Sequence, residues 1–261
     1  MFRPLIALLA CLILGACAGG AVAPSGTQVA FPAGPANPGL TLRGSLYKPQ
    51  GPGPFSAVVV LHHCGGADSE TEAYARRLTA EGYVTIVPDS FGARGVGSVC
   101  ATFAVTPAQR VPDAYAAAAY LRTLPEVRGD RIGLLGFSHG GSVISDLIRH
   151  PPAGTPFRAA VAYYPGCGGN PTIVTVPTLI LVGERDDWTP APPCVAWQAR
   201  TADPNLLDVV VYPGATHKFD GASSRDTLGR GGVWHHLVPD PGAAGDARQR
   251  TDAFFARWLK S

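Results

Sequence analysis

The stretch Leu134–Gly141 reads LLGFSHGG, and it decides the fold that the sequence predicts. An apolar run leads into it, a single hydroxyl, that of Ser138, stands among glycines, and a helix-like segment follows. The five residues GFSHG (Gly136–Gly140) match the pattern G-x-S-x-G, which forms a sharp turn between a strand and a helix. In that turn the serine has a strained backbone and projects its Oγ, while the glycines keep side chains out of a crowded contact. The stretch therefore predicts strand–turn–helix units and a projecting nucleophile.

Strand-like and helix-like segments alternate on both sides of this turn. Six short apolar runs read as strands: 56–63, 83–89, 131–137, 158–165, 176–183 and 207–214. Because helix-like segments separate these runs, they indicate a mostly parallel sheet that is covered by helices on both faces. Residues 28–48 look like leading antiparallel strands. The predicted fold class is therefore α/β, and functional side chains are expected at the carboxyl ends of the strands.

Two helix starts carry a capping box, in which two side chains three residues apart satisfy the first amides of a helix. Ser69 and Glu72 have this spacing, and so do Thr106 and Gln109, with Pro107 at the first helical position. We expect helices to begin at both places.

The composition is that of one globular domain. The chain has 261 residues, of which 46% are hydrophobic and 15% charged, which is enough to bury a sizeable core. The net charge of +2 comes without a block of Lys or Arg, so nucleic acid and anionic membrane surfaces are not expected partners. The 32 glycines and 25 prolines follow no repeat, which excludes collagen-like and low-complexity classes.

The first residues are typical of an export signal rather than of the fold. The apolar run Leu5–Gly15 is shorter than the roughly 20 residues that a membrane-spanning helix needs. It ends in LGAC (Leu14–Cys17), which resembles a bacterial lipobox. We therefore expect a lipoprotein signal over residues 1–16 and lipidation of Cys17, with ordinary cleavage near Ala23 as the alternative.

The segment after the signal, residues 17–38, is rich in Gly, Ala and Pro and predicts a flexible tether. A tether suits a domain that hangs from a lipid anchor, and we expect the folded domain over residues 39–261. These expectations place the protein in the cell envelope, exported and attached to a periplasmic or outer-membrane surface only through the N-terminal lipid.

The cysteines are informative in an exported chain, because oxidising conditions favour disulfides. Cys11 lies in the signal and Cys17 at its end, and the other four cysteines allow three pairings. We favour Cys64–Cys100 and Cys167–Cys194, because each pair lies in loops that follow neighbouring predicted strands. Four buried thiols are the alternative.

A nucleophilic serine needs a base, and an imidazole base needs a carboxylate that fixes its tautomer. The base is expected after the last strand, where YPGATHKF places His217; His235 and His236 are its rivals. The carboxylate is expected after the preceding strand, where Asp186 fits the turn in LVGERDD best and Asp187 is the runner-up. Nucleophile, acid and base would then follow in the chain order Ser–Asp–His.

Two backbone amides are expected to bind the oxyanion that forms during attack on a carbonyl. The N–H of His139 lies at the positive, N-terminal end of the predicted helix after the serine. The second amide should come from LHHCGGAD, where Cys64 is the first choice and His63 the alternative. Gly65 and Gly66 let the backbone approach a substrate closely there.

The consecutive residues His62, His63 and Cys64 also raise the question of a metal site. Neighbouring residues at a strand end point to alternating sides, which gives poor tetrahedral geometry, and no further ligand cluster stands out. We therefore expect no metal here and keep a metal site only as a minor alternative. Cys64 as the nucleophile is disfavoured, because an exported cysteine is more often oxidised. His63, Phe91 and Trp188 are expected to shape the substrate pocket.

Two features fall outside this constellation. Residues 221–245 are long and loop-like, and we expect either a lid or a disordered insertion. Arg94, Arg110 and Asp113 are expected to form a structural salt bridge or a helix cap.

From about residue 40 onward the chain resembles the dienelactone hydrolase family of α/β-hydrolases. The matching pieces are LHHCGG, VPDSFGARGVGSVC, RVPDAYAAAAYL, GFSHGG, LVGERDDWTPAPPC and YPGATHKFD. The resemblance implies an α/β-hydrolase fold and a cofactor-free hydrolase of small esters or lactones, and it supports the same three catalytic residues. The family's namesake enzymes use a cysteine nucleophile, whereas this chain has Ser138. The basic residues with which those enzymes bind a substrate carboxylate are not evident in the sequence.

The sequence therefore predicts a serine hydrolase that cleaves small carboxylic esters or lactones through an acyl-enzyme. One alternative is a non-catalytic envelope lipoprotein that keeps the fold for binding. The other is a peptidase on the same fold.

Overall fold

The computed structural model describes residues 26–261 except 151–153 and 170. The predicted signal, Cys17 and the alternative cleavage site at Ala23 lie outside the described residues. Among the helices of the described part, none is both long enough and apolar enough to cross a bilayer.

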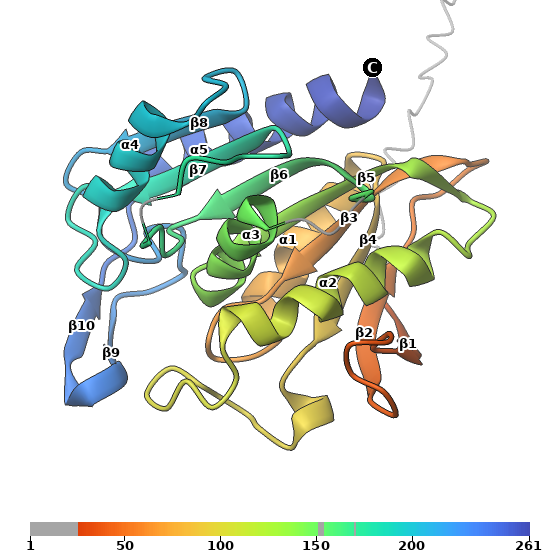
Figure 1. Ribbon diagram of the computed structural model, residues 1–261, viewed down its shortest axis with the longest axis horizontal. Helices are drawn as coiled ribbons and strands as arrows, with labels where there is room; N and C mark the ends of the chain where they lie inside the picture. The colour runs from red at the N-terminus through yellow and green to blue at the C-terminus, as the bar shows by residue number, and fades with distance from the viewer. Residues whose placement is uncertain (1–25, 151–153, 170) are drawn as a thin grey trace, which may run out of the picture.

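An eight-stranded sheet forms the centre of the molecule (Figure 1). Its strands are β1 (Thr27–Pro32), β2 (Thr41–Tyr47), β3 (Phe55–Leu61), β4 (Val84–Asp89), β5 (Val127–Phe137), β6 (Phe157–Tyr163), β7 (Thr178–Gly183) and β8 (Leu207–Tyr212). Along the sheet they lie in the order β1-β2-β4-β3-β5-β6-β7-β8. β2 is antiparallel to β1 and β4, and every neighbouring pair from β4 to β8 is parallel. The mostly parallel sheet predicted from the sequence is confirmed.

The chain enters the sheet earlier than the predicted domain boundary. Residues 27–32 form β1 and pair with β2, so the last part of the expected tether is wrong as a tether and belongs to the fold. Phe31 supplies the physical reason, because its ring is buried and stacks on Tyr120 with the ring centroids 5.1 Å apart. The leading antiparallel strands expected over residues 28–48 are confirmed.

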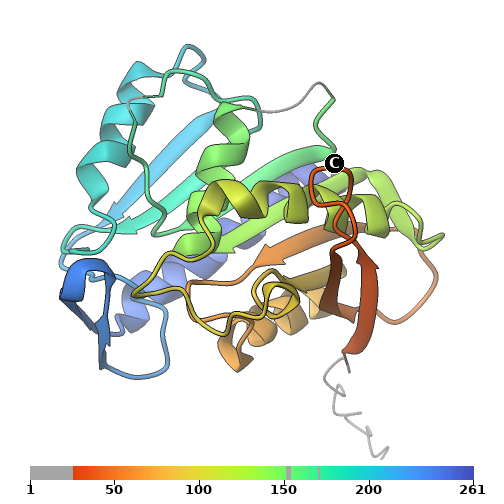
Figure 2. The same ribbon diagram turned by 60° about the horizontal axis from the view of Figure 1, so that its bottom comes forward.

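Helices cover both faces of the sheet (Figures 1 and 2). On one face lie α2 (Pro107–Leu121), α3 (His139–Arg149) and α4 (Ala191–Arg200), and on the other α1 (Ser69–Ala80) and α5 (Pro241–Phe255). The successive residues Val59 and Val60 of β3 are both fully buried, one in each of the two cores. A sheet that is covered twice therefore explains why its strands are continuous apolar runs.

The two predicted helix starts have different caps. The capping box at α2 is confirmed: Thr106 Oγ1 accepts from the Gln109 amide, and Gln109 Oε1 accepts from the Thr106 amide. At α1 the predicted box is wrong, because Asp68 rather than Ser69 is the N-cap, and its carboxylate accepts from the Thr71 amide at 2.9 Å. The positive end of a helix favours a carboxylate at this position.

The segment 221–245 is ordered into a hairpin and a helix start. β9 (Arg225–Leu228) and β10 (Trp234–Leu237) pair antiparallel around the short helical turn η2 (Arg230–Gly232), and α5 begins at Pro241. In Figure 1 the hairpin projects beyond the central sheet at the lower left. A second short turn, η1 (Gly92–Arg94), follows β4.

Candidate active site

Ser138 has a backbone conformation that few residues adopt. It stands between β5 and α3 with φ 51° and ψ −112°. Its amide donates to Tyr163 O at 2.9 Å, which ties the turn to β6. A Cβ at Gly136 would lie 2.4 Å from Gly140 O, and a Cβ at Gly140 would lie 2.2 Å from Leu61 O. The crowded backbone around the turn therefore requires both glycines, and the serine side chain is the one that projects.

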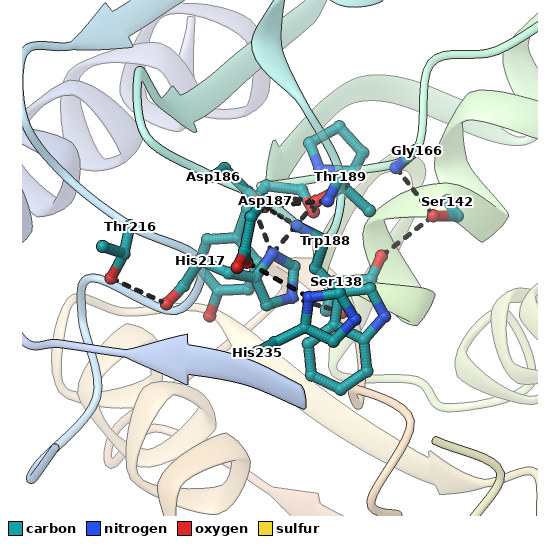
Figure 3. A network of polar contacts seen from close by, with 12 residues as sticks. Ser138, Ser142, Gly166, Asp186, Asp187, Trp188, Thr189, Thr216, His217 and His235 are labelled. Carbon is teal, nitrogen blue, oxygen red and sulfur yellow. Dashed lines mark hydrogen bonds and ion pairs between the residues drawn. The ribbon is translucent and has the colours of Figure 1, made fainter. Parts of the chain in front are cut away.

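Ser138, His217 and Asp186 are connected by hydrogen bonds (Figure 3). His217 Nε2 lies 2.8 Å from Ser138 Oγ, and His217 Nδ1 lies 2.8 Å from Asp186 Oδ2. The three side chains follow β5, β8 and β7, whose carboxyl ends meet at one edge of the sheet. With the Nδ1 proton assigned to the contact with the carboxylate, Nε2 is free to accept the serine proton.

The turn after β7 holds the Asp186 carboxylate in place. Its Oδ1 accepts from the amides of Trp188 at 2.9 Å and Thr189 at 2.8 Å. The Thr189 hydroxyl lies 3.0 Å from Asp186 Oδ2 and 2.9 Å from Tyr164 O. These contacts leave the second carboxylate oxygen directed at the imidazole, as a carboxylate that orients a histidine must be.

Aromatic rings restrict the imidazole of His217. The Tyr164 ring meets it edge-on with the centroids 4.7 Å apart, and the Trp188 ring lies 5.1 Å away. Only 2% of His217 and 7% of Ser138 is exposed. The hydroxyl and the imidazole are thus shielded from bulk water but border a cavity.

The rival residues lie in a separate group. His235 Nδ1 is 3.1 Å from Asp187 Oδ1, and the His235 ring stacks on Trp188 with the centroids 4.4 Å apart. His236 is exposed and pairs with Asp226 within the hairpin. Asp187 therefore contacts the hairpin through His235. Asp186, the first choice for the acid, is the carboxylate that contacts His217.

The loop after β3 has its carbonyl groups engaged. His62 O accepts from Arg110 Nη1 at 3.0 Å, His63 O accepts from His62 Nδ1 at 2.8 Å, and Cys64 O accepts from a backbone amide at 2.8 Å. In a trans peptide the N–H points away from the preceding carbonyl, so the amides of His63 and Cys64 point away from these contacts. Among the described residues, neither the Cys64 amide nor the His139 amide donates to another protein group. Both are thus available to an anion.

Both predicted disulfides are confirmed. Cys64–Cys100 joins the loop after β3 to the segment after η1, and both cysteines line the cavity beside Ser138. Cys167–Cys194 joins the segment after β6 to α4 and does not line that cavity.

A cavity of about 270 Å³ is bordered by Ser138 and His217. Its other lining residues come from the loop after β3, the segment after η1, the turn after β7, the residues after β8 and the hairpin. They are His63, Cys64, Gly65, Cys100, Trp188, Lys218, Arg225, Thr227 and Leu237. His63 and Trp188 line it, as predicted. The hairpin supplies one wall, which gives the segment 221–245 a place at the cavity.

Phe91 does not line the cavity, contrary to the prediction. Its ring is 1% exposed and packs edge-on against His62, with the centroids 4.6 Å apart. Asp89 Oδ1 accepts from the Phe91 amide at 3.0 Å, and this turn directs the ring into the interior. The ring also lies under the Arg110 guanidinium, at 4.9 Å, and so belongs to the layer behind the site.

Two positively charged side chains line the cavity that the sequence analysis did not identify, those of Lys218 and Arg225. Lys218 directly follows His217 and has φ 56°; its ammonium forms an ion pair with Glu70 and lies 3.3 Å from His63 Nε2. The position beside the predicted base was the available signal for Lys218. Arg225 comes from the hairpin, for which the sequence carries no such marker.

His63 belongs to a polar network beside the cavity. Its Nδ1 accepts from the Gly65 amide at 2.9 Å, so its proton lies on Nε2, which donates to Asp68 Oδ2 at 2.7 Å. Burial raises the pKa of Asp68, but hydrogen bonds from His63 and Thr71 outweigh it and hold that pKa well below its ordinary value. The ligand atoms of His63, Asp68 and Glu70 lie within 4.8 Å of one another, close enough to hold a cation. The Lys218 ammonium supplies positive charge beside these three side chains.

Known proteins resemble this chain in sequence and in fold. A family model described as the dienelactone hydrolase family matches residues 42–259. A curated protein of Methylorubrum extorquens named "Putative carboxymethylenebutenolidase" is 28% identical over 189 residues, which make up 64% of this chain and 64% of that protein. One of the same name from Synechocystis sp. is 28% identical over 147 residues, 51% of this chain and 56% of its own length. The matches thus span less than two thirds of either relative.

Among solved structures, one titled as a "Putative Dienelactone Hydrolase" from Klebsiella pneumoniae is similar to this chain. It has 22% sequence identity and a TM-score of 0.71, and the match covers 90% of this chain and 100% of that chain. At this identity the likeness concerns the fold alone. The family model, in contrast, extends from β2 to Leu259 and includes every residue of the hydrogen-bonded group around Ser138. This chain therefore belongs to the dienelactone hydrolase family and has the α/β-hydrolase fold.

Proposed function

We propose that this chain is a serine hydrolase that cleaves small carboxylic esters or lactones through an acyl-enzyme. The observation that carries the proposal is the series of hydrogen bonds from Ser138 through His217 to Asp186, with the hydroxyl at a cavity of about 270 Å³. Family membership supports the substrate class, and the cavity volume favours small substrates.

In the first step Ser138 Oγ bonds to the carbonyl carbon while its proton passes to His217 Nε2. Asp186 stabilises the imidazolium that forms. The carbonyl oxygen becomes an oxyanion and accepts from the amides of His139 and Cys64; a donor of this kind typically contributes about 3 kcal/mol. His217 then returns the proton to the leaving alkoxide as the C–O bond breaks, and the acyl group stays on the serine.

In the second step water releases the acyl group. His217 takes a proton from the water as the water oxygen attacks the acyl carbon, and Ser138 Oγ leaves with the proton from the imidazolium. One water is consumed, and an acid and an alcohol are formed. With a lactone, the alcohol stays attached to the acyl chain, so a single hydroxy acid leaves.

A fluorophosphonate probe, which reacts with activated serines, separates this enzyme from a non-catalytic envelope lipoprotein. We expect the wild-type protein to be labelled and to hydrolyse p-nitrophenyl acetate, and Ser138→Ala to lose both properties. Ser145→Ala is the matched control, because Ser145 is a buried hydroxyl on α3, the helix that follows Ser138, and has no hydrogen-bond partner among the described residues. A folded wild-type protein that is neither labelled nor active would favour the binding protein.

The peptidase alternative is tested with a matched ester and amide of one acyl group. An amine leaves only when an aligned acid protonates it, whereas an activated alkoxide leaves readily. We expect turnover of the ester and none of the amide at the same enzyme concentration. Comparable turnover of both would replace the esterase with a peptidase.

We further propose that the protein is exported and held in the cell envelope by a lipid on Cys17, after removal of residues 1–16. The two disulfides support export, because such bonds persist in oxidising compartments. In cells fed labelled palmitate we expect the wild-type protein to carry the label and sediment with membranes. Cys17→Ser should lose the label and the sedimentation; an unlabelled wild-type protein cut near Ala23 would contradict lipidation.

A further inference from the structure

Arg110 is a fully buried arginine that no carboxylate contacts directly among the described residues, although the charges of Asp113 and Asp89 act on it from further away. It lies on α2 with 0% of its surface exposed. The salt bridge expected in this region forms without it, because Asp113 receives two hydrogen bonds from Arg94, at 2.8 and 2.9 Å. Within the described part of the chain, Arg110 Nε and Nη2 have no hydrogen-bond partner. The guanidinium is therefore not part of a buried ion pair.

Its hydrogen bonds go instead to two segments of the site. Nη1 donates to His62 O at 3.0 Å and to His139 Nδ1 at 2.8 Å. His62 directly precedes the loop residues His63 and Cys64, and His139 directly follows the nucleophile. A single nitrogen thus connects the two segments that carry the proposed oxyanion donors.

The two histidines are neutral neighbours of this cation. His139 Nε2 lies 3.0 Å from Val105 O, so it carries the proton and Nδ1 accepts from the guanidinium. Burial, and then the charge of Arg110, lowers the pKa of His139 to about 3. Burial lowers the pKa of Arg110 to about 9, which leaves the guanidinium charged at neutral pH.

Burial still outweighs the favourable charges of Asp113 and Asp89 on this guanidinium. A buried charge that no carboxylate contacts directly is unfavourable for folding, and an apolar side chain of similar volume often serves stability as well or better. The cation contacts the Phe91 ring face at 4.9 Å, which offsets a part of this cost. Stability alone therefore does not account for an arginine here. The negative charge that develops at the oxyanion gives a reason for the arginine, because a fixed cation in a dry interior interacts strongly with that charge.

We propose that Arg110 is a positioning residue of the oxyanion site, which joins the loop after β3 to the start of α3 and places a positive charge behind both amide donors. The proposal rests on the proposed function. By holding His62 O, the guanidinium fixes the His62–His63 peptide, which directly precedes the peptide that carries the Cys64 amide. By holding the His139 ring, it fixes the residue whose amide is the other proposed donor. Both amides would then be aligned before the substrate arrives.

The test uses Arg110→Gln and Arg110→Met, which remove the charge, and Arg110→Lys, which keeps it. An alkylboronic acid serves as the probe, because its tetrahedral adduct with the serine carries the oxyanion that the ground-state ester lacks. For each variant, kcat and KM for p-nitrophenyl acetate, the boronate inhibition constant and Tm are measured. Arg149→Met is the matched control, since Arg149 also packs on an aromatic ring at 4.9 Å and donates to a backbone carbonyl at 2.7 Å, outside the cavity lining.

We expect the neutral variants to lose about 10- to 100-fold in kcat and a similar factor in boronate affinity, with KM nearly unchanged. Arg110→Lys should recover most of both losses, and Arg149→Met should keep wild-type values even where its Tm falls. If Arg110→Met does not fold, Arg110→Gln and Arg110→Lys still test the proposal, because each variant's loss of boronate affinity can be compared with its change in KM.

Neutral variants with wild-type kcat and boronate affinity would overturn the proposal. So would losses that Arg149→Met shares at equal Tm, or a lysine variant no better than the glutamine variant. A wild-type protein that neither turns over esters nor binds the boronate would instead count against the proposed function, which keeps the two failures apart.

Discussion

At the scale of single residues, two adjacent carboxylates show how position assigns a role. Asp186 Oδ2 lies 2.8 Å from His217 Nδ1, whereas Asp187 Oδ1 lies 3.1 Å from His235 Nδ1. Asp186 is 4% exposed and receives two backbone amides, so its charge is oriented as well as buried. Asp187 has an exposed side chain and contacts only the hairpin imidazole among the described charges.

Asp186→Asn should therefore abolish most of the activity while the fold persists. An amide in place of the carboxylate no longer selects the Nδ1–H tautomer of His217, and kcat is expected to fall by about 10³- to 10⁴-fold. Steady-state hydrolysis of p-nitrophenyl acetate measures it, with circular dichroism as the check on folding. Asp187→Asn, the matched control, should stay within about threefold of wild type; the reverse ranking would assign the acid to Asp187.

At the scale of elements, the two disulfides differ in what they join. Cys64–Cys100 links the loop of one proposed oxyanion donor to the segment after η1, and Cys64 O also accepts from the Val99 amide at 2.8 Å. Cys167–Cys194 links the segment after β6 to α4, away from the cavity lining. The first bridge restrains a part of the site, and the second restrains only the fold.

Removing either bridge should lower the free energy of unfolding by a similar amount, about 3–4 kcal/mol for loops of 36 and 27 residues. Only Cys64→Ser with Cys100→Ser should also lower kcat, by about tenfold, because the donor loop is no longer held. Urea unfolding and ester kinetics at a temperature where both variants are folded measure the two effects. Equal rate losses in the Cys167→Ser, Cys194→Ser pair would show that the first bridge has no special role.

At the scale of the whole molecule, buried neutral histidines make stability depend on pH. Burial and the charge of Arg110 lower the pKa of His139 to about 3 and the pKa of His62 well below its ordinary value of 6.5. An unfolded chain protonates both near pH 6.5, while the folded chain does not. Between pH 6.5 and about 3 the unfolded state therefore binds more protons, and stability falls as the pH falls.

The free energy of unfolding should accordingly drop by up to about 1.4 kcal/mol per pH unit for each of these histidines. Urea titrations at pH 7, 6 and 5 measure the slope. His139→Gln should remove about half of it, whereas His236→Gln, at an exposed histidine, should leave it unchanged. Equal stability at pH 7 and pH 5 would contradict the expectation.

The sequence by itself determined the parts of this protein that depend on short-range patterns. The strand runs, the turn around Ser138 and the Thr106 capping box each lie within a few neighbouring residues, and the local backbone obeys the same rules in any fold. Chain order and the position after predicted strands were enough to nominate His217 as the base and to favour one of the three possible pairings of the four cysteines.

Tertiary structure alone decided which of several similar residues meets a distant partner. Ser138 and His217 are 79 positions apart in the chain. The packing of β7, β8 and the hairpin gives the adjacent carboxylates different partners, His217 for Asp186 and His235 for Asp187. Packing likewise places the Phe91 ring in the interior behind the site, and it makes β1 a strand of the sheet. Local sequence does not encode such distances, because they result from the simultaneous burial of many side chains from remote elements.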